Sequence, residues 1–365
     1  MKIFKVVIIL ALFGLAACRE EMPNLVDGNA EIKLVALWDT SSVAGVIKYT
    51  PLPGAKVILN SIYGVFVKYL DNEGKISIGN LPSASYDISV RMPLPEDPSI
   101  IIVGNIKGVE VNPGDVAIDT VFGKAISSSG ISINEIYACG PVNNIFFFYD
   151  QFIELYNSSD SVKYLDGMIV MRVSGNSDEG LLGPGADEGE DGDIDGVTYI
   201  SKFPGSPGEK NYPFDPKTFI VLACDAVNHK NSMSAAVDLS NADWEFYNQY
   251  SANDIDNPNV KNLINMRSDK TVDFLISLVS DVIVVASGVD TVWSDGIDIS
   301  TIIDGVEYQT SSTVRKTLDN RVDRGWVLSP STYSGRSMRR REVGEDTNDG
   351  TLDFEITNSP TPGYH

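Results

Sequence analysis

Short apolar segments rich in β-branched residues recur along this 365-residue chain, separated by clusters of Gly, Pro, Asn and Asp. After one such cluster, Asp71–Lys75, the run Ile76-Ser77-Ile78 alternates strictly between apolar and polar residues. Alternation with a period of two is typical of a β-strand that buries one face. Short strands separated by turns about every ten residues are typical of a β-sandwich. The sequence therefore predicts an all-β protein.

The composition limits the classes of function. A hydrophobic share of 43% is enough for ordinary buried cores, and the length favours two or three domains. The 28 Lys and Arg residues against 50 Asp and Glu give a net charge of −22, which disfavours nucleic acid as a partner. With two histidines and no motif for a catalytic serine, a zinc site or a phosphate-binding loop, the chain is predicted not to be an enzyme.

The N-terminus has the pattern of an export signal with a lipid attachment site. An apolar run, Val6–Leu15, follows two lysines and is too short to span a bilayer. It ends in Leu15-Ala16-Ala17-Cys18, which resembles the lipobox of bacterial lipoproteins. We therefore predict a signal peptide over residues 1–17 and lipidation at Cys18, the alternative being an ordinary signal peptide with a chance cysteine.

A tether over residues 18–29 follows the lipid cysteine. Its start, Arg19-Glu20-Glu21, resembles the surface-export tag of Bacteroidota lipoproteins, although solvated tether residues would look the same. The expected location is the outer membrane, lipid-anchored and facing the cell exterior, with the periplasmic leaflet left open. The lipid anchor predicts the membrane as a partner.

Residues 30–122 carry three phrases of a known β-sandwich type. These are Gly54-Ala55-Lys56-Val57, the turn Asp71–Gly74 and Leu81-Pro82 followed by Tyr86. They resemble the prealbumin-like, carboxypeptidase-regulatory-like domains, with Ser85 standing where a Gly-Thr pair is usual. The resemblance implies a spacer or interaction module without catalytic residues.

A small-residue segment at 123–130 is the predicted linker to a second domain at 131–365. This domain resembles the lamin-tail domain, an immunoglobulin-like β-sandwich. The matching segments lie at its two ends: Ile133–Ile136, Asp150–Asn157, Leu165–Met168, Asp353-Phe354 and Ser359–Gly363. Taken whole, the chain resembles Bacteroidota lipoproteins that join these two modules.

The second domain is longer than the lamin-tail pattern, so we predict insertions at about 174–213 and 227–300. Within the latter, Ala242–Tyr247 is predicted to form a short helix and Ile276–Val289 one or two buried strands. Long insertions are where specialised function tends to lie.

The first insertion contains an acidic loop with Asp191, Asp193 and Asp195 in a D-x-D-x-D-G run. Alternate carboxylates before a glycine turn are what a Ca²⁺ loop requires. Lys202 occupies the position where an EF-hand has its bidentate glutamate, which excludes a complete EF-hand. The loop is either a calcium site or a solvated acidic turn, and no other cofactor is predicted.

The second insertion contains the aromatic residues of a candidate binding face: Trp244, Tyr247, Tyr250 and Trp293. On one shallow surface they would favour a carbohydrate or protein ligand. Scattered through the core they would have only a structural role.

Four other features have expected structural roles. Glu135 and Glu154 belong to lamin-tail strand phrases and are expected to be framework residues. The turn Asp346–Gly350 is expected to be structural, and Arg336–Arg341 to form an edge strand with outward arginines. Cys139 and Cys224 lie in apolar contexts and are expected to be buried and free, with a disulfide between them left open.

The function that these features favour is a non-catalytic binding or assembly module at the cell surface, associated with a nutrient-uptake receptor. The alternative is a hydrolase accessory or weak hydrolase with its active residues in the insertions. The identity of the ligand and the oligomeric state are left open.

Overall fold

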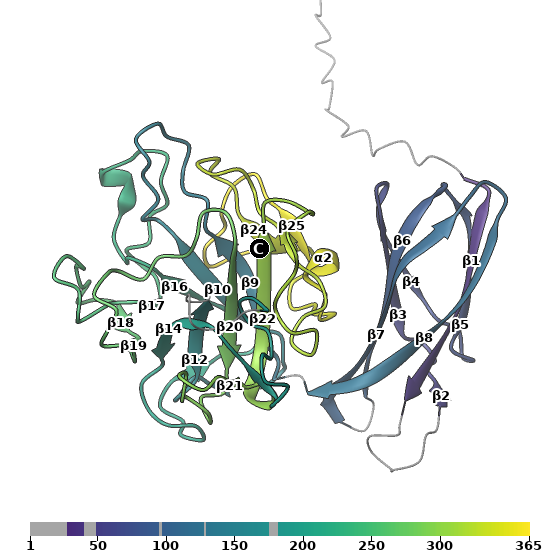
Figure 1. Cartoon of the computed structure of the whole chain (residues 1–365), viewed down its shortest axis with the longest axis horizontal. Helices are drawn as coiled ribbons and strands as arrows, with labels where there is room; N and C mark the ends of the chain where they lie inside the picture. Colours follow the sequence, from purple (N-terminus) through teal and green to yellow (C-terminus); the bar gives the residue numbers. More distant parts are fainter. Residues whose placement is uncertain (1–27, 40–48, 95–96, 128, 175–181) are drawn as a thin grey trace, which may run out of the picture.

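The computed structural model describes residues 28–39, 49–94, 97–127, 129–174 and 182–365. It contains two β-sandwich units side by side, which confirms the all-β prediction (Figure 1). The predicted signal peptide, Cys18 and the export tag lie outside the described residues. Among the residues that are described, no helix is long and apolar enough to cross a membrane.

The first unit is an eight-stranded β-sandwich. Its strands follow the order β2-β1-β8-β7-β6-β3-β4, with β5 paired to β1. The strands are β1 (Ala30–Asp39), β2 (Tyr49–Pro51), β3 (Lys56–Ser61), β4 (Gly64–Tyr69), β5 (Lys75–Leu81), β6 (Ala84–Leu94), β7 (Asp97–Val111) and β8 (Val116–Ser127).

Local chemistry explains the turn between β4 and β5. The carboxylate of Asp71 accepts the backbone N–H groups of Glu73 and Lys75 at 2.8 and 2.9 Å. Gly74 closes the turn at a φ of +72°, and a Cβ there would meet the backbone nitrogen of Leu52 at 2.8 Å. Only glycine fits both the left-handed backbone and the close approach. Apolar side chains at alternate positions of these strands form one core inside the sandwich.

The connection between the units is shorter than the predicted linker at 123–130. Strand β8 continues to Ser127, and Lys124–Ser127 pair with β7. Strand β9 (Ile131–Tyr137) begins almost at once. The small polar residues that suggested a linker are therefore paired in a sheet for most of that range.

The second unit is a sandwich of two large sheets. One has the order β18-β17-β16-β10-β9-β24-β25 and the other β19-β14-β12-β20-β22-β23. The remaining strands of the first sheet are β10 (Phe152–Asn157), β16 (Phe219–Ala223), β17 (Trp244–Glu245), β18 (Lys261–Asn262), β24 (Met338–Arg340) and β25 (Phe354–Ile356). Those of the second are β12 (Ile169–Val173), β14 (Val197–Lys202), β19 (Ile264–Asn265), β20 (Asp281–Ala286), β22 (Ile302–Gln309) and β23 (Val327–Leu328).

Short elements complete this unit. Two small sheets pair β11 (Lys163–Tyr164) with β15 (Pro213–Phe214) and β13 (Asp193–Ile194) with β21 (Ile297–Asp298). The helical turns are η1 (His229–Asn231), η2 (Ile299–Thr301) and α2 (Gly350–Asp353), whose N-cap is Asp349. The turn at 346–350 thus leads into α2 and is structural, as predicted.

Both sheets of the second unit are buried on both faces. One apolar cluster fills the space between them, and two others cover their outer faces. Every residue of β9, β10 and β20 is consequently buried, including the polar ones. Strands buried on both faces read as continuous apolar runs rather than alternating ones, as Asp281–Ala286 does.

The predicted insertions are not peripheral. Residues 174–213 supply β14 and residues 227–300 supply β20, which are both interior strands of the second large sheet. The helix predicted at Ala242–Tyr247 is wrong, because Trp244 and Glu245 pair in parallel with Leu222 and Ala223 of β16. The segment Ile276–Val289, predicted to form one or two buried strands, forms one, β20.

Ion pairs connect the two units, and a cleft lies between them. Lys56 lies 2.6 Å from the carboxylate of Glu345, and Lys107 lies 3.1 Å from that of the buried Asp349. We call the space of about 450 Å³ beside them the inter-domain cleft. Its lining includes Asn60 from the first unit and Trp326 and Phe354 from the second.

Candidate functional site

An open pocket of about 310 Å³ at one end of the second unit combines aromatic and hydrogen-bonding side chains. We call it the Tyr149 pocket. Tyr149 reaches it from the β9–β10 connection, Arg172 from β12 and Tyr199 from β14. The rest of the lining comes from the segment that leads to β20: Ser251, Asn253, Thr271, Val272, Asp273 and Leu275.

The two tyrosines are held by other rings. The Tyr149 ring stacks on Phe148 with centroids 5.1 Å apart and an interplanar angle of 11°. Tyr199 packs edge-on against Phe274 at 5.5 Å, and the guanidinium carbon of Arg172 lies 5.9 Å from its ring centroid. Packing of this kind fixes both rings before a ligand arrives, which lowers the entropic cost of binding.

The polar groups of the pocket are partly engaged and partly free. Arg172 pairs with Asp281 and donates to the carbonyl of Leu275 at 2.8 Å. Asp273 accepts the Ser251 hydroxyl at 2.7 Å. Within the described part of the chain, neither the Asn253 side-chain amide nor the Tyr149 hydroxyl has a hydrogen-bond partner, so both can bind a ligand.

Further carboxyls lie behind the pocket. Burial, followed by the charge of Asp273, raises the pKa of Asp225 to about 6. Burial likewise raises the pKa of Asp254 to about 6, with Asp273 and Asp225 adding to it. One carboxylate oxygen of Asp225 is buried without a hydrogen-bond partner among the described residues. Such shifted groups gather at functional sites more often than elsewhere.

The predicted aromatic face is not formed. Trp244 is 3% exposed and packs edge-on against Phe203 in the core between the sheets, which makes its assignment to a surface wrong. Trp293 lies under the guanidinium of Arg267, with 3.6 Å between the guanidinium carbon and the ring centroid. Tyr247 is half-buried and Tyr250 is exposed, and neither lines the Tyr149 pocket.

The acidic loop does not gather its carboxylates around one point. Asp195 accepts the backbone N–H of Glu188, and Asp193 lies in β13 opposite Asp298. Asp187, which the sequence analysis did not select, caps the turn by accepting the N–H groups of Asp191 and Gly192 and pairs with Arg321. Across the described residues there is no group of three or more His, Cys, Asp or Glu side chains that could hold a metal ion. The geometry therefore does not support Asp191, Asp193 and Asp195 as a calcium site.

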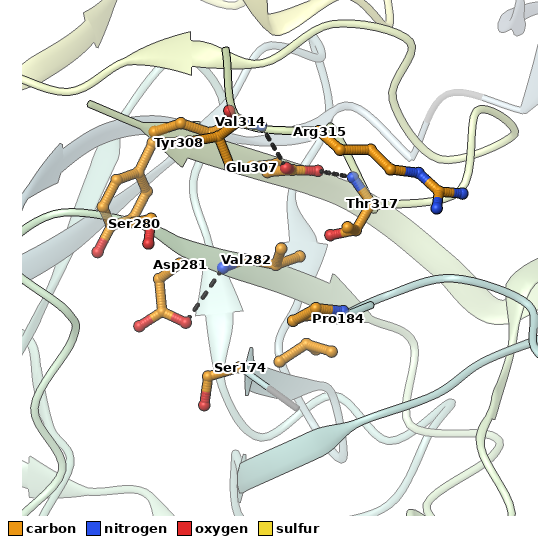
Figure 2. Close-up of a pocket in the computed structure, with 12 residues that line it drawn as sticks. Ser174, Pro184, Ser280, Asp281, Val282, Glu307, Tyr308, Val314, Arg315 and Thr317 are labelled. Carbon is orange, nitrogen blue, oxygen red and sulfur yellow. Dashed lines mark hydrogen bonds between the residues drawn. The ribbon is translucent and has the colours of Figure 1, made fainter. Parts of the chain in front are cut away.

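A second pocket, of about 160 Å³, lies at the ends of β12, β20 and β22 in the second large sheet (Figure 2). Its carboxylates serve the fold. Glu307 accepts the N–H groups of Thr317 and Leu318 and the Gln309 amide, and Asp281 accepts Ser277, Val282 and Arg172. Its acidic groups are thus engaged, which makes it a weaker candidate than the Tyr149 pocket.

The arginine-rich segment is an interior strand, not an edge. Strand β24 pairs with both β9 and β25. Arg340 points inward and is fully buried, 2.8 Å from Asp304 and 3.1 Å from Asp353. The prediction of outward arginines is wrong for this residue, because carboxylates from distant segments converge on it.

Glu135 and Glu154 hold the C-terminal segment in place. Glu135 accepts the backbone N–H and the hydroxyl of Thr361, and Glu154 accepts the N–H of Gly363. Both are fully buried, as framework residues are. Cys139 and Cys224 are buried and free, as predicted.

Sequence reasoning did not select any residue of the Tyr149 pocket. Its lining comes from four separate stretches of chain, so no spacing reveals it. The one local signal was the aromatic run Phe146–Tyr149, which is exceptional in a connection between strands.

Comparisons with known proteins find a family model that matches part of the chain lining this pocket. The family described as "Protein of unknown function (DUF4876)" matches residues 215–297, which supply six of the nine residues of the Tyr149 pocket. A search of curated proteins finds no significant match.

Among solved structures, the chain is similar to a DUF4876 family protein from Bacteroides thetaiotaomicron. The identity is 20%, the TM-score is 0.52, and the match covers 89% of this chain and 94% of that one. A candidate carbohydrate-binding protein from Bacteroides uniformis (16% identity, TM-score 0.18, 40% of this chain and 61% of that one) is too distant in structure to carry an argument. The same holds for the pilus protein RrgB from Streptococcus pneumoniae (10%, 0.20, 41% and 37%). The findings thus show a segment, residues 215–297, that is similar to the DUF4876 family, within a fold similar to that of a solved DUF4876 family protein.

Proposed function

We propose that this protein is a lipid-anchored outer-membrane module that binds a neutral oligosaccharide, without catalysis, at the Tyr149 pocket. The observation that carries the proposal is the combination of the exposed, ring-packed Tyr149 with free hydrogen-bonding groups in one open pocket, over the buried Tyr199. A sugar ring offers an apolar C–H face and an edge of hydroxyls, and such a lining matches both.

Charge favours a neutral sugar over an acidic one. Asp273 lines the pocket, and Asp225 and Asp254 lie close enough for the charge of Asp273 to raise the pKa of both. Arg172, the only cation among the lining residues, is already paired with Asp281. An anionic ligand would meet uncompensated negative charge.

The lining also supports binding over hydrolysis. Glycoside hydrolysis ordinarily uses two carboxyls that flank the scissile bond. Asp273 is the only carboxylate of the lining, and the Ser251 hydroxyl already donates to it. The observation that favours the alternative, a weak hydrolase, is the raised pKa of Asp225 and Asp254, which suits a general acid.

The test is binding of the purified mature chain to an array of neutral and acidic oligosaccharides, followed by calorimetry on the strongest neutral ligand. Tyr149→Ala and Asn253→Ala should each weaken binding about tenfold or more, which corresponds to about 1.4 kcal/mol. Tyr164→Ala, which removes a partly exposed tyrosine on β11, is the matched control. Equal loss in the control, or release of reducing sugar from the bound ligand, would overturn the proposal.

The proposed cellular location rests on the sequence alone. The lipobox supports acylation at Cys18, and Arg19-Glu20-Glu21 supports export to the cell surface, where the module would hold glycans beside a nutrient-uptake receptor. Cys18→Ala should abolish palmitate incorporation, because it removes the thiol to which the lipid would be attached, and with it the stable anchoring that several acyl chains give. Incorporation at the wild-type level in that variant would exclude the lipid anchor.

A further inference from the structure

We propose that the β9–β10 connection carries a membrane-contact surface that inserts apolar side chains into the lipid interface. We call Val142, Ile145 and Phe146 the apolar tip. The inference rests on the proposed lipid anchor. It concerns the apolar tip of the β9–β10 connection, whereas the Tyr149 pocket takes only Tyr149 from that connection.

The tip exposes large apolar side chains where a soluble surface would carry polar ones. Phe146 is 72% exposed, and Ile145 and Val142 are nearly as exposed. From Gly140 to Tyr149 the chain has no acidic or basic residue, although its overall charge is −22. Contiguous exposed apolar groups mark interaction sites.

Hydrogen bonds from the Asn143 side chain fix the conformation of the loop that exposes these side chains. The Asn143 amide donates to the carbonyls of Pro141 and Phe147 at 2.7 and 2.9 Å. Its oxygen accepts the N–H groups of Ile145 and Phe147 at 3.0 Å. Phe146 is thereby held at a φ of +60°, an uncommon backbone conformation for a large side chain. Residues kept in such conformations cluster at functional sites.

The surroundings of the tip suit a lipid surface. Phe147 contacts the ring of His229, next to the exposed Lys230, and Val142 lies beside Gly335, next to the exposed Arg336. Apolar and aromatic groups flanked by Lys and Arg are typical of segments that lie in the membrane interface.

Topology places the tip at the edge of the molecule where the chain enters from the anchor. Strand β8 begins beside the start of β1, because Val116 pairs with Glu31, and it ends at the connection to β9. Figure 1 shows β9 running back from that connection, so that the β9–β10 loop and the start of β1 both lie at the upper edge. The hairpin between β3 and β4, whose Ile62 is 85% exposed, lies at this edge too, since Asn60 pairs with Asp87 near the start of β6.

The length of the tether then selects a membrane as the occupant. Nine residues, 19–27, separate the proposed acyl cysteine from Gly28, so the two are ten Cα-to-Cα steps apart. Fully extended they span at most about 33–36 Å, so the anchor keeps this edge within reach of the bilayer. The apolar tip thus lies at the edge of the molecule that the proposed anchor holds nearest to lipid.

The experiment uses the acylated protein in vesicles of phosphatidylethanolamine and phosphatidylglycerol, with an environment-sensitive fluorophore on an introduced thiol. Phe146→Cys carries the probe at the tip, and Ile145→Cys is a second tip variant. Val289→Cys is the matched control, because Val289 is 74% exposed and lies in the β20–β21 connection, at the lower edge in Figure 1. The native Cys139 and Cys224 are buried and do not take the label.

We expect the probe at the tip to shift its emission to the blue and to be quenched by brominated acyl chains, and the probe at position 289 to do neither. A tip probe that stays in water on vesicles that carry the protein would overturn this inference and leave the anchor intact; the tip would then be a protein contact. A wild-type protein that does not float with vesicles would overturn the anchor and the inference together.

Discussion

Arg340 shows how much the second unit depends on one buried charge. Its guanidinium donates to the carbonyl of Ile133 at 2.7 Å and pairs with Asp304 and Asp353. Replacing Arg340 with Met keeps most of the volume and leaves both carboxylates buried without their cation. Removal of one partner of a buried ion pair costs about 3–5 kcal/mol. We therefore expect the free energy of unfolding of Arg340→Met, measured by urea denaturation, to fall by about that amount.

Arg336→Ala is the control for this substitution. Arg336 lies four residues earlier, is exposed and donates to the Asn358 side chain. Exposed substitutions change stability by about 0.5 kcal/mol or less. Similar losses in the two variants would contradict the assigned role. The sequence could not reveal this role, because Asp304, Asp346 and Asp353 reach Arg340 from separate segments and no local pattern links them.

At the scale of elements, the C-terminal segment closes one face of the first large sheet of the second unit. Deletion of residues 358–365 removes the Thr361 donors to Glu135 and the Gly363 N–H that one oxygen of Glu154 accepts, while Asn134 still donates to the other oxygen of Glu154. A buried acceptor left unpaired costs about 1–3 kcal/mol, so the two together should lower the stability by about 2–6 kcal/mol. Thermal and urea unfolding measure it. Deletion of 364–365 alone retains these bonds and should have little effect, and equal effects of the two deletions would refute the role.

Prediction from sequence succeeded for long strands and failed for short ones. The phrases at 131–137 and 152–157, selected for their resemblance to strands of a known β-sandwich, form β9 and β10. The two-residue strand β17 carries no such pattern, and parallel pairing with β16 overrides the helical preference of its neighbours. The same limit applies to the Tyr149 pocket, whose residues only the fold brings together.

At the scale of the whole molecule, buried carboxyls should make stability depend on pH. Burial raises the pKa of Glu154 to about 8 and that of Glu245 to about 7, from an ordinary 4.5. Between about pH 8 and pH 5 the folded chain therefore takes up protons that the unfolded chain does not, and the free energy of unfolding should increase as the pH falls through this range. Urea midpoints across the range check this. Glu154→Gln should flatten the upper part of the slope, and stability that increases with pH in this window would contradict it.

A crystal structure of the chain with its strongest neutral oligosaccharide tests most directly whether the Tyr149 pocket is the ligand site. We expect a sugar ring against Tyr149, with hydroxyls bonded to Asn253 and Asp273, in the pocket that residues 215–297 largely line. An ordered sugar in the inter-domain cleft beside Trp326, with the Tyr149 pocket empty, would contradict it.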